Sequence, residues 1–322
     1  MKKFIIPIAA ILLLTACEKQ IDIDIEEQEP LVVMHSFATP DNPLYVDLTM
    51  SRPVFGWHSS DEGCINSPFP PVENATVTLD VEGVGNYTAT RDSNRYTFPY
   101  TPQSGDRMQL RVDVPGHETL TASTTMPQPP SLGQVSYEVA EDNYGEQYLI
   151  IHVPLNDPAG EENYYSFQIN ITRYYYPQFD AEGNLVNYES VSTETNWINC
   201  NDQFVVENNV SDIFMDDPGS MPEFWGNTLF FTDRLLNGIS HTIDLKTNYL
   251  QVNNNNLYTV AELVATSYSR EEYYFHATEK QLNDVDEIIS IFSEPSTAYS
   301  NVNGGAGAFG AHCTQVIEFL RN

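Results

Sequence analysis

The chain contains few positively charged residues. Of its 322 residues, 14 are Lys or Arg and 45 are Asp or Glu, so its formal net charge is −31 at pH 7. Nucleic-acid binding depends on cationic contacts to phosphate, and anionic lipid surfaces attract basic segments. The composition therefore excludes nucleic acid as a partner and disfavours an anionic lipid surface. Two interpretations of the acidity stay open, namely solubility outside the cytoplasm and attraction of cationic ligands.

Cysteine is scarce, and the motifs of common catalytic sites are missing. The four cysteines include no Cys-x-x-Cys pair, the spacing typical of zinc and thiol-redox sites. The sequence also lacks the His-Glu-x-x-His, Gly-x-Ser-x-Gly and Gly-x-x-x-x-Gly-Lys motifs of zinc proteases, serine hydrolases and phosphate-binding loops. Its seven histidines are scattered along the chain. We therefore expect no catalytic residues, no metal ligands and no cofactor.

Apolar runs long enough to cross a bilayer are also missing near the N-terminus. The run from Phe4 to Leu14 follows two lysines, is broken by one proline, and is too short for a permanent membrane helix. Small residues and a cysteine follow it, which is the layout of a secretory signal peptide. The segment Leu14-Thr15-Ala16-Cys17 resembles the lipobox of bacterial lipoproteins. That resemblance implies cleavage after residue 16 and a lipid on Cys17. An ordinary cleaved signal and a buried apolar helix are the alternatives.

Residues 17–30 are expected to form an acidic tether. Acidic residues alternate there with Ile21, Ile23 and Ile25, a period of two that suits either a sheet-edge strand or a solvated leash. Acidic residues soon after a lipidated cysteine resemble the surface-export signal of Bacteroidota lipoproteins. The resemblance implies display on the outer face of the outer membrane.

The rest of the chain is typical of β-sheet, with 19 Tyr, 16 Phe and 20 Pro and few segments of helical period. Residues 31–127 have the length and alternation of a seven-strand sandwich. The order of the strands is similar to Ig-like, prealbumin-like and carboxypeptidase-regulatory-like modules. The expected strands cover residues 31–37, 44–50, 75–81, 87–91, 95–100, 108–114 and 117–126.

The proline-rich segment from Pro127 to Pro130 marks the expected domain boundary. Residues 128–322 are predicted to form a second β-rich domain with one or two short helices. Its clearest strand covers residues 161–176 and returns through the turn 180–184 into residues 185–195. The oxygen side chains of that turn favour a hairpin turn over a calcium site. Residues 230–236 are expected to form a short helical turn.

The clearest helix begins at a capping box, Ser269-Arg270-Glu271-Glu272, and continues to Asn283. The glycine-rich stretch 303–310 follows it. That stretch lacks the lysine of a phosphate loop, so we interpret it as a place where backbones approach closely. We expect it to be a loop that packs near the helix and closes the end of the second-domain sheet, with Phe309 buried.

Cysteines and tyrosines of the second domain supply two further expectations. Cys200 and Cys313 are expected to form a disulfide, and Cys64 to be free in its loop. Alternation along a strand should bury half of each aromatic cluster at 164–165, 174–176 and 273–275. An interface is expected only if Tyr164, Tyr174 and Tyr176 gather on one surface.

Several late motifs together resemble one family. They are the segment from Phe231 to Gly238, the pair Tyr273-Tyr274, Glu294-Pro295, and the stretch 300–310, in which Ala306 and Ala308 replace bulkier aliphatic residues. With the lipoprotein start, they resemble the Bacteroidota lipoproteins catalogued as domain of unknown function 4249. The resemblance implies outer-membrane attachment, a TonB-dependent receptor as partner, and no defined catalytic residues.

The predicted function is that of a non-catalytic accessory or ligand-capture subunit of a TonB-dependent uptake system. The alternative is an adhesin or structural surface protein without a transporter partner. A hydrolase is disfavoured because the catalytic motifs named above are missing.

Replacing Cys17 tests the anchor. The Cys17→Ala variant lacks the thiol that would carry the lipid, so it should leave the membrane fraction, as measured by fractionation and mass spectrometry. A wild-type protein that begins at Cys17 but carries no acyl mass would contradict the expectation.

Overall fold

The computed structural model describes residues 29–51, 69–93, 95–206, 224–248, 256–283 and 298–321. Residues 1–16, Cys17, most of the tether and Cys64 lie outside these ranges. The chain is mainly β, as predicted, and its described part contains two helices, α2 (Gln203–Val206) and α3 (Arg270–Asn283). Neither helix is long and apolar enough to cross a membrane.

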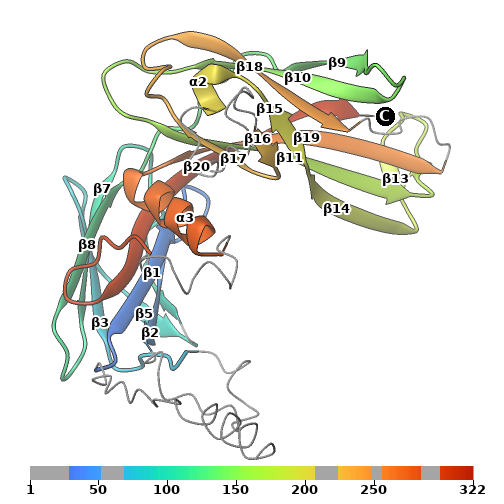
Figure 1. Cartoon of the computed structure of the whole chain (residues 1–322). Helices are drawn as coiled ribbons and strands as arrows, with labels where there is room; N and C mark the ends of the chain where they lie inside the picture. The colour runs from blue at the N-terminus through green and yellow to red at the C-terminus, as the bar shows by residue number, and fades with distance from the viewer. Residues whose placement is uncertain are drawn as a thin grey trace, which may run out of the picture.

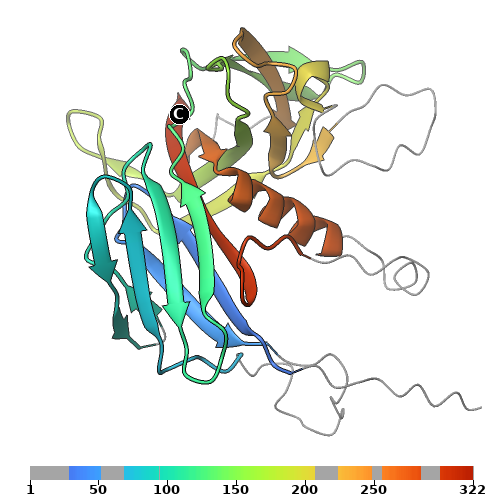
Figure 2. The same ribbon diagram turned by 90° about the vertical axis from the view of Figure 1, so that its left-hand side faces the viewer.

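The first unit is a sandwich of two sheets, which Figure 2 shows at the lower left. Alternating side chains such as Val32, Met34, Val77 and Leu79 point inward and form its core. One sheet contains β1 (Val32–Ala38), β2 (Tyr45–Met50), β6 (Arg95–Thr97) and β5 (Thr90–Asp92). The other contains β4 (Gly85–Thr88), β3 (Thr76–Val81), β7 (Arg107–Asp113) and β8 (Leu120–Thr125).

The second unit also packs one sheet against another (Figure 1). Leu149, Ile151 and Ile169 lie in its core, which brings the two sheets together. One sheet contains β14 (Ser190–Asn196), β11 (Tyr164–Tyr175), β19 (Leu257–Tyr268), β20 (Ala306–Arg321) and β17 (Leu229–Thr232). The other contains β16 (Phe224–Gly226), β15 (Ile198–Cys200), β18 (Ser240–Asn248), β10 (Gln147–Asn156) and β9 (Ser136–Glu141). The predicted hairpin is confirmed, because β11 and β14 pair antiparallel.

Strand β20 belongs to both units. Residues 306–311 pair in parallel with β1, and residues 312–321 pair antiparallel with β19. A single nine-stranded sheet therefore runs through both units. The side chain of Phe309 lies in the first core and that of Leu320 in the second. The first core therefore includes residues from the end of the chain, which follow the expected boundary between residues 31–127 and 128–322.

The glycine-rich stretch is a place of close backbone approach, as predicted. Gly307 has a φ of +109°, and a Cβ atom built on it would overlap the carbonyl oxygen of Met34. However, most of the stretch is the start of strand β20 and not a loop. The expectation that it closes the second-domain sheet is wrong, since Phe309 packs into the first core and residues 306–311 pair with β1.

Helix α3 packs against β20, where the two units meet (Figures 1 and 2). Ser269 caps it, because its Oγ accepts hydrogen bonds from the backbone N–H of Glu272 at 3.3 Å and of Ala311 at 3.1 Å. The second half of the predicted capping box is replaced, since the N–H of Ser269 donates to the carbonyl of Ala311 at 2.7 Å. A Cβ atom on Gly310 would overlap Glu272, so the glycine lets the helix approach the strand.

The expected helical turn at 230–236 is instead strand β17 followed by a turn over residues 234–238. Its first residues pair with β11, so an added partner strand outweighs the local tendency to turn.

The Phe309→Ala variant tests the shared core. Phe309 is 0% exposed, so its loss should lower the free energy of unfolding by about 3–5 kcal/mol. Chemical denaturation of the full chain measures this. The matched control Phe179→Ala removes the same atoms from a ring that is 45% exposed and should cost far less. Equal losses for the two variants would contradict the packing described here.

Candidate functional site

A buried carboxylate lies at the junction of the two units. Glu272, in the first turn of α3, is 2% exposed. Its Oε1 lies 2.7 Å from His312 Nδ1 of β20 and 3.4 Å from His276 Nε2. Its Oε2 is buried and has no hydrogen-bond partner among the described residues. The strand alternation that predicted Cys313 and His312 on opposite faces is confirmed, because Cys313 lies in the first core.

The two histidines keep this carboxylate charged. Burial acts to raise the pKa of Glu272, but hydrogen bonds from His276 and His312 and the charges of these histidines lower it below its ordinary value. Burial acts to lower the pKa of His276, but the hydrogen bonds and charges of Glu272 and Glu279 raise it overall. The Glu272 carboxylate and the protonated His276 ring therefore stabilise each other.

A cavity of about 330 Å³ opens beside this cluster. The end of β1, the start of β2 and the segment between them form one side, and α3 and β20 form the other. The residues that line it are Phe37, Thr39, Asn42, Pro43, Leu44, Tyr45, Glu272, His276 and His312. We call it the junction cavity.

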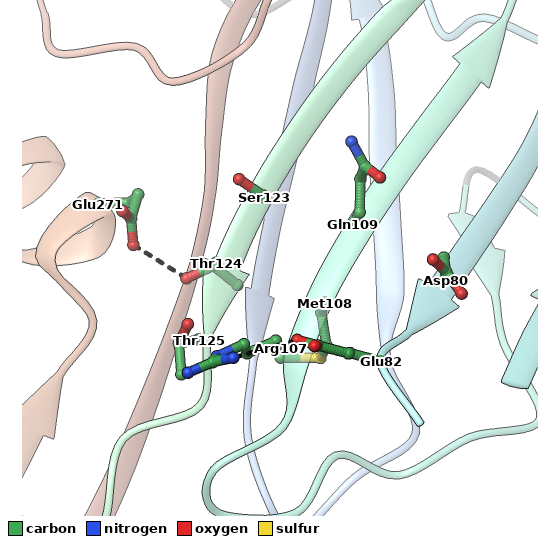
Figure 3. Close-up of a pocket in the computed structure, with 9 residues that line it drawn as sticks. All are labelled: Asp80, Glu82, Arg107, Met108, Gln109, Ser123, Thr124, Thr125 and Glu271. Atoms are coloured by element: carbon green, nitrogen blue, oxygen red, sulfur yellow. Dashed lines mark hydrogen bonds and ion pairs between the residues drawn. The ribbon is translucent and has the colours of Figure 1, made fainter. Parts of the chain in front are cut away.

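A second, more open pocket of about 440 Å³ lies on the outer face of β3, β7 and β8 (Figure 3). Three of its four charged side chains have a polar partner. Arg107 lies 3.3 Å from Glu82, and Thr124 donates to Glu271 at 3.1 Å across to helix α3. Exposed pairs of this kind contribute little energy. The two neighbouring helix carboxylates have different surroundings, since Glu271 contacts β8 and Glu272 is buried with histidines.

A third feature is an exposed aromatic surface on the hairpin between β11 and β14. The hairpin contains β12 (Gln178–Phe179) and β13 (Leu185–Asn187). Large apolar side chains there are between 38% and 61% exposed. They are Tyr175, Tyr176, Phe179, Val186, Tyr188 and Val191. Two of these rings contact other rings, with ring centroids 5.0 Å apart for Tyr188 and Tyr174 and 5.2 Å apart for Phe179 and Tyr258. We call this set the hairpin surface.

The gathering of Tyr164, Tyr174 and Tyr176 expected for an interface does not occur. Tyr164 is buried at one end of β11, where its ring centroid lies 4.9 Å from that of Tyr273. Tyr174 and Tyr176 lie at the other end of the strand, with the hairpin surface. The sequence did not indicate Phe179, Val186 or Tyr188, because strands of two or three residues are too short to show a period.

The prediction of a disulfide between Cys200 and Cys313 is wrong. Both are buried free thiols, with Cys200 in the second core and Cys313 in the first. The reason is the path of β20, which brings Cys313 to within 3.2 Å of the carbonyl oxygen of Pro127. Burial raises the pKa of the Cys200 thiol to about 12. Cys64 lies outside the described residues.

The turn at 180–184 and the segment 231–238 are structural. The Asp180 carboxylate accepts backbone hydrogen bonds from Glu182 at 3.1 Å and Asn184 at 2.7 Å, which confirms the predicted turn. Asp233 is 0% exposed and accepts from the side chains of Asn163 and Asn237 at 3.1 and 3.2 Å. These bonds join the end of β17 to the segment before β11.

Metal binding has no support in the described ranges, where no three His, Cys, Asp or Glu side chains are arranged to hold an ion.

Two comparisons bear on identity. The family described as Domain of unknown function (DUF4249) matches residues 18–316, which is nearly the whole chain. No curated protein matches the chain.

The Glu272 cluster predicts a pH-dependent stability. Because the pKa of Glu272 is lowered in the folded protein, its charge stabilises the fold at pH values above its ordinary pKa of 4.5. This contribution is lost as the pH falls through the folded pKa. Because the pKa of His276 is raised in the folded protein, its charge stabilises the fold at pH values below its ordinary pKa of 6.5. This contribution is lost as the pH rises through the folded pKa. Glu272→Gln should therefore cost most between pH 4.5 and 6.5, by roughly 1.5–3 kcal/mol.

Denaturation of both proteins over a pH series measures the difference, with Glu271→Gln as the neighbouring control that keeps the cluster. A cost of Glu272→Gln that stays constant from acid to mildly alkaline pH would contradict the paired charges.

Proposed function

The chain belongs to the Domain of unknown function (DUF4249) family, and from this premise we propose that it is a non-catalytic accessory subunit of a TonB-dependent uptake system. In this proposal the lipid on Cys17 holds the protein on the outer membrane, facing outward. The subunit captures ligand or caps the transporter. The transporter and the membrane location come from the sequence resemblance, and the contact surface comes from the structure.

The hairpin surface carries the proposal. Monomeric proteins rarely expose large contiguous apolar patches, and such patches mark interaction sites. Aromatic residues are also enriched in the cores of protein interfaces. Tyr176, Phe179 and Tyr188 are 56%, 45% and 42% exposed, although the chain is strongly acidic, with a formal net charge of −31. Burying these rings against a partner would remove apolar surface from water, and this would favour binding by roughly 25 cal/mol of free energy for each Å² buried.

The position of the hairpin suits a membrane-held subunit. In Figure 1 the first unit and the start of β1 lie at the lower left, and β13 and β14 lie on the right-hand side of the second unit. A chain attached through residues preceding β1 would therefore present the hairpin on the side away from its attachment. Strand β20 connects the two units in this arrangement, because it pairs with β1 in one and with β19 in the other.

A hairpin variant tests the surface. The double substitution Phe179→Ser and Tyr188→Ser should abolish co-purification of a β-barrel receptor from detergent-solubilised outer membranes. Tyr144→Ser is the matched control, because Tyr144 is 91% exposed and lies outside the hairpin. All three proteins should unfold at similar temperatures, since substitutions of exposed residues usually change stability by about 0.5 kcal/mol or less.

Two outcomes contradict the proposal in different ways. If the wild type retains no receptor under mild conditions, the adhesin or structural alternative is favoured. If the hairpin variant retains the receptor as well as the wild type does, the partner contacts another surface.

A further inference from the structure

Asp233 Oδ1 is a buried oxygen to which none of the described residues donates a hydrogen bond. The Asp233 side chain is 0% exposed and directly follows strand β17. Its other oxygen, Oδ2, already accepts from the side-chain amides of Asn163 at 3.1 Å and Asn237 at 3.2 Å. A buried polar atom without a partner is costly, so its presence in a native protein requires an explanation.

A second buried carboxyl group lies against Asp233. Asp157 directly follows β10, is 7% exposed, and makes a side-chain hydrogen-bond contact with Asp233. Its Oδ1 accepts from the hydroxyl of Tyr165 at 2.8 Å, and its Oδ2 accepts from the N–H of Gly238 at 3.0 Å. We call Asp157 and Asp233 the carboxyl pair. Two carboxylate ions have no donor between them, so their contact is a hydrogen bond only if one of them carries a proton.

The surroundings of the carboxyl pair supply no neutralising cation. In the part of the chain that the structure describes, neither residue forms an ion pair with Lys, Arg or His. The hydroxyl of Tyr165 bonds to the pair, Arg234 is exposed, and His241 bonds to Asp202 instead. The titratable side chains on the segments around the pair are Tyr165, Glu161, Glu162, Arg234 and His241.

Two like charges in one buried site repel each other, and burial adds to the cost. Burial raises the pKa of Asp233 above its ordinary value, and the charge of Asp157 raises it further. The hydrogen bonds from Asn163 act in the opposite direction and do not cancel this rise. One carboxyl group of the pair therefore holds its proton more firmly than an exposed aspartate does.

We propose that the carboxyl pair shares one proton, which Asp233 Oδ1 donates to Asp157, and that this proton holds the turn 234–238 against the segment 157–163. Asp233 carries it because its Oδ1 is the one oxygen of the pair that receives no other described donor. This inference does not depend on the proposed function. The pair lies where β17 joins the start of β11, and the hairpin surface lies at the other end of β11.

The contact responds to pH in one direction. Because the pKa of Asp233 is raised in the folded protein, its proton stabilises the fold most below the ordinary pKa of 3.8. This contribution is lost as the pH rises through the folded pKa. Two like charges then remain in a buried site, so the turn 234–238 should open more often. The contribution of Glu272 has the opposite sign, since it is lost as the pH falls.

Carboxyl titration of the full chain tests the proton. Carbon-13 NMR of protein labelled at the side-chain carboxyl carbon of aspartate follows each group, and the Asp233 signal is assigned through its own backbone. In the wild type this signal should titrate well above pH 3.8. A midpoint at or below 3.8 would overturn the proposal. A calcium-dependent change of the signal would overturn it too, because a cation would then hold the pair in place of the proton.

Hydrogen exchange at the Gly238 amide measures how firmly the turn is held. This amide donates to Asp157, so it exchanges when the turn opens. In the wild type its opening constant should rise with pH, by about 10-fold for each unit by which the pKa of Asp233 is raised. In Asp233→Asn the side-chain amide can donate to Asp157 at every pH, so the opening constant should not change. Equal rises in the two proteins would overturn the proposal.

A matched variant tests which residue carries the proton. In Asp157→Asn, an amide nitrogen takes the place of an oxygen that accepts from Tyr165 or Gly238. This variant should therefore unfold at a lower temperature than Asp233→Asn. The reverse order would place the proton on Asp157 and overturn the assignment. If either variant fails to fold, the titration of the wild type still decides, because it needs neither of them.

Discussion

The pairing of β20 with both β1 and β19 is the constraint on which the rest of the structure depends. One unbroken strand supplies Phe309 to the first core and Leu320 to the second. The first half of the strand pairs with β1 and the second half with β19, so both units are built on the same backbone segment. The parallel partner of Val33 is Ala306, so nearly the whole chain must be present before the first sheet is complete.

The junction of the units depends on that strand in turn. Helix α3 can lie on β20 only because Gly310 has no side chain, and this contact brings Glu272 of the helix against β20. A buried carboxylate is costly unless it is paired, and His312 reaches it from β20 while His276 reaches it from the next turn of α3. The charged cluster and the cavity beside it are therefore consequences of how the two units are joined.

The surface divides into polar and aromatic regions with different meanings. The outer face of β3, β7 and β8 carries charges that pair with one another, as Arg107 does with Glu82, and this suits simple solvation. The hairpin surface carries exposed rings that rest on other rings. Solubility does not explain such rings, so they support the view that this side of the second unit meets a partner.

The sequence by itself determined the secondary structure where local patterns were strong. Alternation placed β1, β2, β3 and β7 within one residue of their observed bounds and indicated the hairpin of β11 and β14, and the residues following Ser269 indicated helix α3. The glycines of 303–310 indicated close backbone approach, because a missing Cβ is a local property. Tertiary structure alone decided which strands share a core. Pairing between β1 and β20 joins segments from opposite ends of the chain, and neither segment carries a local signal of the other. Because this pairing could not be read from the sequence, the prediction of a Cys200–Cys313 disulfide was wrong, and Phe309 was not expected in the first core. The histidine partners of Glu272 are likewise visible only in the folded chain.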